Sequence, residues 1–342
     1  MLIGTAILVV VLPGCVEVKD STKVSEGTQS SSPTGEGFKD KLSESEPIRV
    51  VTTTNILRDW VENVGGDRVQ VYSIVPDAVD PHTFRPSPKE MKYLEQAHMV
   101  FLVGQHYEEH WLGSLSHNVV RGASKIVYLS ESVELRPYSR RSGSIGGAET
   151  TASTYEVENS YENLEEYDPH FWHDPLRVVG AINRIAFELN GMTLTENSDF
   201  ESQAESYIAK LEKLNRWIVS QVAKIPNERR VLITSHETMG YFAERYDFEI
   251  ADSMMSGLSS AESVNPRQIA GIIDKIEEME IETVFGEPQM SDKVANAVSG
   301  DTGVRFVYLN SESIGNAEGG VAADYIEMMK LNVKTIVNGL SR

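Results

Sequence analysis

The feature that most constrains the fold is a regular alternation of β-branched apolar runs with segments of helical periodicity. Apolar runs in the first half lie at 48–54, 69–76, 98–104 and 125–130. Comparable runs in the second half lie at 229–235, 248–255, 282–288 and 304–310. Short strands that alternate with helices form parallel sheets, because each helix returns the chain to the same edge. The sequence therefore predicts an α/β protein with two lobes, each a parallel sheet flanked by helices.

A long helical segment lies between the two series of strands. Pro175 opens a helix that ends near Gly191, and a second helix is expected over 198–225. At about 1.5 Å per residue the second helix is roughly 40 Å long, which is the size of a whole domain. A chain of 342 residues is long enough for two domains of ordinary size. We predict an N-terminal lobe (48–174), linking helices (175–226) and a C-terminal lobe (227–342).

The N-terminal segment differs in composition from the rest of the chain. The apolar run at 3–12 is too short to span a bilayer. It ends in Leu12-Pro13-Gly14-Cys15, which resembles a lipoprotein processing site within a signal segment at 1–15. Cys15 would then carry the lipid and anchor the protein to the outer face of the cell membrane; the alternative is an apolar N-terminus with a buried cysteine. Residues 16–47 are rich in small and polar residues and predict a flexible tether.

Charge and cysteine usage narrow the classes of function. The formal net charge of −20 argues against binding to nucleic acid, which is itself a polyanion. Cys15 is the only cysteine, so a transition-metal site in the body of the protein must use histidine and carboxylate. The acidic segment 139–167 interrupts the alternation, and it is either a solvated insertion or a weak collector of cations.

Three histidines are expected to meet between the lobes. His82 follows the second strand of the first half, His236 follows the first strand of the second half, and His170 precedes the linking helices. Ligands of open parallel sheets bind beyond the carboxyl ends of the strands. An Asp-Pro pair precedes both His82 and His170 and restricts the backbone there. Neutral imidazoles suit Zn²⁺ and other late first-row ions, so this arrangement predicts a metal site.

Several motifs resemble those of one family, the zinc- and manganese-type substrate-binding proteins of ABC transporters. The motifs are TTTNILRDWVENVGGD (52–67), VDPHTFRPSP (79–88), DPHFWHDP (168–175), SHETMGYFAERY (235–246) and GEPQ (286–289). The resemblance covers the chain from Ile48 to its C-terminus. It implies two α/β lobes joined by a long backbone helix, and metal ligands at His82, His170 and His236. Manganese members often carry glutamate at the third of these positions, so His236 favours Zn²⁺.

The fourth ligand position departs from the family pattern. The family usually has an aspartate after its last strand, where this chain has the neutral Asn310. Asn310 could bind through its carbonyl oxygen, or the place could be taken by water, Glu312 or Glu237; we expect water or a glutamate. His173 is also unusual for the family, and it could be an auxiliary ligand or a packed side chain.

The resemblance implies an extracytoplasmic, monomeric receptor that performs no chemistry. It would capture Zn²⁺, or alternatively Mn²⁺, and deliver it to an ABC permease with its ATPase subunit. A distant alternative is a zinc metalloprotease, because HYEEH (106–110) matches the H-x-x-E-H pattern with two histidine ligands and Glu109 as base. A further alternative is an adhesive or structural surface lipoprotein that binds no metal.

Overall fold

The structure is a computed structural model. It describes residues 46–77, 79–108, 125–138, 167–193, 199–255, 266–315 and 322–341. The predictions for Cys15, the tether and all but the last residue of the acidic segment lie outside these residues. Among the described residues, no helix is both long and apolar enough to cross a membrane.

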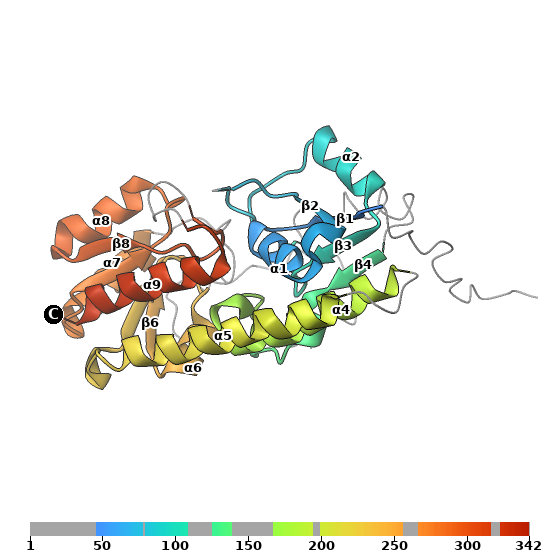
Figure 1. The fold of residues 1–342 in the computed structure, drawn as a ribbon. Helices are drawn as coiled ribbons and strands as arrows, with labels where there is room; N and C mark the ends of the chain where they lie inside the picture. Colours follow the sequence, from blue (N-terminus) through green and yellow to red (C-terminus); the bar gives the residue numbers. More distant parts are fainter. Residues whose placement is uncertain are drawn as a thin grey trace, which may run out of the picture. The chain divides into compact units, whose positions relative to one another are not determined.

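The first half forms a four-stranded parallel sheet, as predicted. Its strands are β1 (Ile48–Thr52), β2 (Val69–Ser73), β3 (Met99–Leu102) and β4 (Lys125–Tyr128), in the order β2-β1-β3-β4. Helix α1 (Asn55–Gly65) follows β1, and α2 (Pro88–Gln96) precedes β3 (Figure 1). The apolar stripe of α1 at helical spacing is fully buried, with Ile56, Trp60 and Val64 in the core. Burial of this stripe fixes α1 against the sheet.

The second half contains four parallel strands that form two separate ladders. The strands are β5 (Val231–Thr234), β6 (Glu249–Ser253), β7 (Thr283–Gly286) and β8 (Arg305–Tyr308), paired as β5-β6 and β7-β8. The neighbouring helices are α6 (Gly240–Tyr246), α7 (Pro266–Glu278), α8 (Asp292–Thr302) and α9 (Tyr325–Leu340).

The sequence predicts one continuous sheet in this half, and the structure differs in one respect. Strands β5 and β7 contact each other, but no ladder joins them among the described residues. The register of β5 shifts between Leu232 and Ile233, where it pairs with β6. Such an irregularity interrupts the regular spacing of backbone groups.

Two helices connect the halves. Helix α4 (Pro175–Gly191) is followed by α5 (Phe200–Val222), whose 23 residues correspond to about 35 Å (Figure 1). Helix α5 contacts α1 and α4, which precede it in the sequence, and α9, which follows it. The apolar stripe of α5 is buried, from Tyr207 through Leu214 to Val222. The long helix is thus part of the same core as both halves, while the exact lobe boundaries stay a prediction.

Short 3₁₀ turns complete the described elements. They are η1 (Gly66–Arg68), η2 (Leu129–Ser132), η3 (Phe171–His173) and η4 (Asn227–Arg229). The third of them matters for function, because His170 is its N-terminal flanking residue and Asp174 caps the helix α4 that follows. The DPHFWHDP motif is therefore a compact turn leading into a linking helix.

Candidate metal centre

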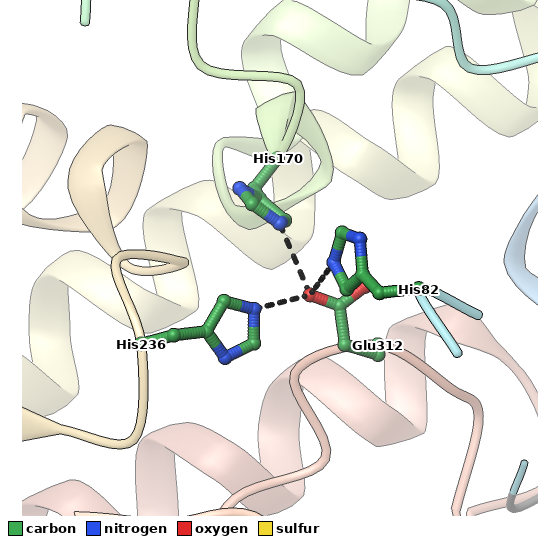
Figure 2. Close-up of side chains that lie close together, drawn as sticks. All are labelled: His82, His170, His236 and Glu312. Atoms are coloured by element: carbon green, nitrogen blue, oxygen red, sulfur yellow. Dashed lines mark ion pairs between the residues drawn. The ribbon is translucent and has the colours of Figure 1, made fainter. Parts of the chain in front are cut away.

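Four buried side chains face one another in a compact cluster (Figure 2). They are His82, His170, His236 and Glu312, and one ligand atom from each lies within 4.8 Å of the other three. His82 lies in the loop after β2 and His236 two residues after β5, whereas Glu312 lies in the loop after β8. The carboxyl ends of parallel strands thus supply three of the four groups, as expected for α/β folds.

The four atoms have nearly the spacing that a tetrahedral metal requires. Oε1 of Glu312 lies 3.1 Å from Nε2 of His170, 3.2 Å from Nε2 of His236 and 3.7 Å from Nε2 of His82. Ligands at the usual zinc bond lengths would be separated by about 3.3 Å. Within the described part of the chain, these four atoms have no well-aligned hydrogen-bond partner. Such a cluster of buried polar atoms fits a cation at its centre.

The two Asp-Pro-His motifs fold in the same way. Oδ1 of Asp80 accepts a hydrogen bond from the backbone N–H of His82 at 2.9 Å. Oδ1 of Asp168 accepts the equivalent bond from His170, also at 2.9 Å. An aspartate that bonds the backbone two residues later makes a tight local turn. The aspartate side chain as well as the proline therefore presents each histidine.

Carboxylates also lie beside the Nδ1 atoms of two histidines. Nδ1 of His170 lies 2.8 Å from Oδ1 of Asp168, and Nδ1 of His236 lies 3.0 Å from Oε1 of Glu287. That same Glu287 oxygen accepts a hydrogen bond from Oγ of Ser311 at 2.6 Å. A partner on Nδ1 fixes the tautomer and leaves Nε2 available as a ligand. Glu287 belongs to the GEPQ motif, but sequence reasoning assigned it no role.

The loop that carries Glu312 is held by residues far away in the sequence. Tyr107 donates from its hydroxyl to Oε2 of Glu312 at 2.6 Å, and Nε1 of Trp172 donates to the carbonyl of Ser311 at 2.7 Å. Asn310 N–H donates to Oδ1 of Asn332 at 2.9 Å, and Nδ2 of Asn332 donates to the Asn310 carbonyl at 2.7 Å. Glu312 therefore sits on a loop fixed at three points.

The charged groups at the centre shift one another's pKa values toward their charged forms. Burial lowers the pKa of His170, but Glu312 and Asp168 outweigh burial and raise this pKa to about 9. Burial also lowers the pKa of His236, but Glu287 and Glu312 outweigh burial and raise this pKa to about 10. Burial alone would raise the pKa of Glu312, yet His170 and the other imidazoles hold it well below its ordinary value. The raised pKa values of His170 and His236 favour their protonated forms beside the carboxylate of Glu312.

The remaining candidates lie outside the group of four. His173 is fully buried beside Trp172, with ring centroids 5.9 Å apart, and burial together with His170 lowers its pKa to about 4. Asn310 forms its backbone bonds with Asn332, and Glu237 is half-buried and absent from the cluster. The structure thus places Glu312, one of the alternatives, at the fourth corner.

The HYEEH stretch does not appear as a helical face in the described residues. His106 is exposed and lies in a turn over 105–108, with a φ of 64°. Glu109 and His110 lie outside the described residues. Tyr107, from the middle of this stretch, instead reaches the histidine cluster, a contact that sequence reasoning missed.

Residues 50–339 match the sequence profile of the family described as zinc-uptake complex component A, periplasmic (ZnuA). The chain belongs to this family. The motifs that resembled metal-type substrate-binding proteins therefore identified the correct family.

Curated proteins similar to this ZnuA-family chain carry names of metal-binding lipoproteins. The manganese-binding lipoprotein MntA of Halalkalibacterium halodurans is 30% identical over 302 residues, which cover 87% of this chain and 90% of MntA. The metal ABC transporter substrate-binding lipoprotein SloC of Streptococcus mutans is 29% identical over 308 residues, covering 88% and 93%.

Solved structures confirm the fold class of this ZnuA-family chain. The periplasmic zinc-binding protein TroA of Treponema pallidum has a TM-score of 0.71 at 24% identity, covering 87% of this chain and 100% of TroA. A crystal structure of ZnuA has a TM-score of 0.72 at 24% identity, covering 86% and 100%. At this identity the similarity establishes the α/β architecture alone.

Proposed function

We propose that this protein is the substrate-binding component of an ABC importer for a divalent transition metal. The observation that carries the proposal is the convergence of three imidazole nitrogens and one carboxylate oxygen in a buried cluster. Two of these side chains, His82 and His170, come from the first half of the chain, and His236 and Glu312 come from the second. A metal at the centre would therefore link both halves.

The ion proposed as cargo is Zn²⁺. Three imidazole nitrogens and one carboxylate oxygen form a four-ligand set with the softness and geometry that zinc prefers. The competing proposal is that the cargo is Mn²⁺. It is supported by relatives that are named as manganese-binding, such as MntA. Manganese usually prefers more oxygen ligands than this cluster supplies.

The metal would be carried without chemical change and handed to a membrane permease driven by an ATPase subunit. The family membership and the ABC transporter names of relatives such as SloC support these partners. We further propose that the protein acts outside the cytoplasm, as a monomer attached through a lipid on Cys15. The lipoprotein names of the relatives support the anchor.

The test is a competitive titration of the metal-free full chain with Zn²⁺ and Mn²⁺ against a chelating dye. We expect one Zn²⁺ per chain, bound more tightly than Mn²⁺. The variants His82→Ala, His170→Ala and His236→Ala should each weaken binding at least about tenfold. The matched control is His106→Ala, which removes an exposed histidine outside the cluster.

Each other outcome selects a different account. Tighter binding of Mn²⁺ by the native chain would favour the manganese receptor. Absence of metal binding and of any thermal shift would favour the adhesive or structural lipoprotein, because a ligand specific for the folded state must stabilise it. Equal losses for His106→Ala and the three cluster variants would refute the site.

A further inference from the structure

Glu312 presents its two oxygens to different partners. Oε1 faces the three histidines at 3.1 to 3.7 Å, whereas Oε2 accepts the hydroxyl hydrogen bond of Tyr107 at 2.6 Å (Figure 2 for Glu312 and the histidines). A carboxylate can bind a metal through one oxygen or through both. The hydrogen bond directs Oε2 toward Tyr107, so Oε1 is the oxygen that faces the space among the histidines.

Tyr107 itself is held firmly in place. Its ring meets His82 edge-on, with centroids 4.9 Å apart, and it packs in the same manner on His170 and Trp172 at 6.0 and 5.5 Å. The side chain is 2% exposed. A ring enclosed on three sides cannot move its hydroxyl without displacing its neighbours.

The backbone before Tyr107 is equally constrained. Gly104, Gln105 and His106 all have positive φ values, of 92°, 53° and 64°. Non-glycine residues adopt this region only where the surroundings enforce it. Here the buried carboxylate of Glu108 accepts hydrogen bonds from the N–H groups of Val103 and Gly104 at 2.7 and 3.0 Å. The turn therefore fixes the position of the Tyr107 hydroxyl.

We propose that Tyr107 is a positioning residue that sets metal selectivity by restricting Glu312 to one coordinating oxygen. This inference rests on the proposed function. Three nitrogens and one oxygen give the four-coordinate geometry that suits Zn²⁺. Binding through both oxygens would give five ligands with a larger oxygen share, which Mn²⁺ tolerates better. The Tyr107 hydroxyl thus favours zinc by keeping Oε2 away from the metal.

The test variant is Tyr107→Phe, which removes the hydroxyl and keeps the ring. We expect the ratio of Zn²⁺ to Mn²⁺ affinity to fall by about tenfold, the factor expected for loss of one charge-assisted hydrogen bond. The X-ray absorption spectrum of the manganese-loaded variant should contain one more oxygen neighbour than that of the manganese-loaded native chain. A purely structural role for Tyr107 would lower both affinities together and leave the neighbour count unchanged.

The matched control is Tyr207→Phe. Tyr207 is also buried and donates to a carboxylate, Oδ2 of Asp59 at 2.9 Å, but on helix α5 away from the cluster. It should leave the zinc-to-manganese ratio unaltered. Thermal unfolding of both metal-free variants shows whether each is folded, and if Tyr107→Phe is unfolded, Tyr107→Leu provides a second apolar replacement that has no hydroxyl and no metal-binding group.

The outcomes separate this inference from the proposed function. A native chain that binds neither metal overturns the proposed function. A native chain that binds Zn²⁺, combined with a folded Tyr107→Phe protein of unchanged metal ratio and unchanged oxygen count, overturns the role of Tyr107 alone. If Tyr107→Leu has to be used, the native ratio of Zn²⁺ to Mn²⁺ affinity in that variant would likewise overturn the role of Tyr107.

Discussion

Oδ1 of Asp168 binds His170 twice, through the backbone N–H at 2.9 Å and through Nδ1 of the ring at 2.8 Å. One carboxylate oxygen thereby fixes both the position of the histidine and the direction of its ring. Since Nδ1 is occupied, Nε2 is the nitrogen that faces Glu312. Asp168 thus fixes both the backbone and the ring of His170, one of the proposed metal ligands.

The first prediction concerns this contact. Asp168→Asn keeps the shape of the side chain but removes the charge that orients and polarises the ring of His170. Zinc affinity should fall about 10- to 100-fold, as is typical for partners of metal-ligating histidines. Isothermal titration calorimetry measures it. Unchanged affinity would mean that the carboxylate of Asp168 has no influence on binding.

The second prediction concerns the fourth corner of the cluster. Glu312→Gln should weaken Zn²⁺ binding by at least about tenfold, because a neutral amide replaces the only carboxylate in the described cluster. The control is Glu237→Gln, a glutamate next to His236 that lies outside the cluster. If water were the fourth ligand, Glu312→Gln would bind zinc with nearly native affinity.

The third prediction concerns protons. His170 and His236 have pKa values raised to about 9 and about 10 in the metal-free protein, so both carry protons at pH 7. Ligation requires neutral imidazole, so binding of Zn²⁺ at pH 7 should release about two protons from this pair. Affinity should therefore rise with pH from 6 to 9. Calorimetry in buffers of different ionisation enthalpy counts the protons, and no dependence on the buffer would contradict the charged metal-free site.

The fourth prediction concerns His173. This side chain is fully buried, outside the cluster, and its pKa is lowered to about 4, so it is neutral at pH 7. His173→Ala should lower the free energy of unfolding by about 2–4 kcal/mol, as expected for loss of a buried ring. The folded fraction should keep its zinc affinity. A large loss of zinc affinity without loss of stability would instead make His173 a ligand.

Local pattern was sufficient for much of the fold. The stripe of Ile56, Trp60 and Val64 predicts α1, and the apolar positions from Tyr207 to Val222 predict the long helix α5. Each follows from periodicity within one segment, which burial of one face enforces. The split between the β5-β6 and β7-β8 ladders has no such local signal, because strand pairing depends on register between distant segments.

Some residues of the candidate site could likewise be predicted from local sequence, and others could not. His82 and His170 stand out in the sequence because each follows an Asp-Pro pair, His82 after a predicted strand and His170 before the linking helices. Glu312 was one alternative among several, and Tyr107 was missed, because their contact joins residues 205 positions apart. Sequence reasoning attributed the rigidity of the Asp-Pro-His motifs to proline, and the structure adds the hydrogen bonds of the aspartates.

The most direct test of the account is the zinc K-edge X-ray absorption spectrum of the zinc-loaded native chain. We expect about four light-atom neighbours near 2.0 Å, with the outer-shell scattering of about three imidazole rings. In His236→Ala the outer-shell scattering should correspond to one imidazole ring fewer. A spectrum dominated by oxygen neighbours, without imidazole scattering, would contradict the assignment of His82, His170, His236 and Glu312 as the metal site.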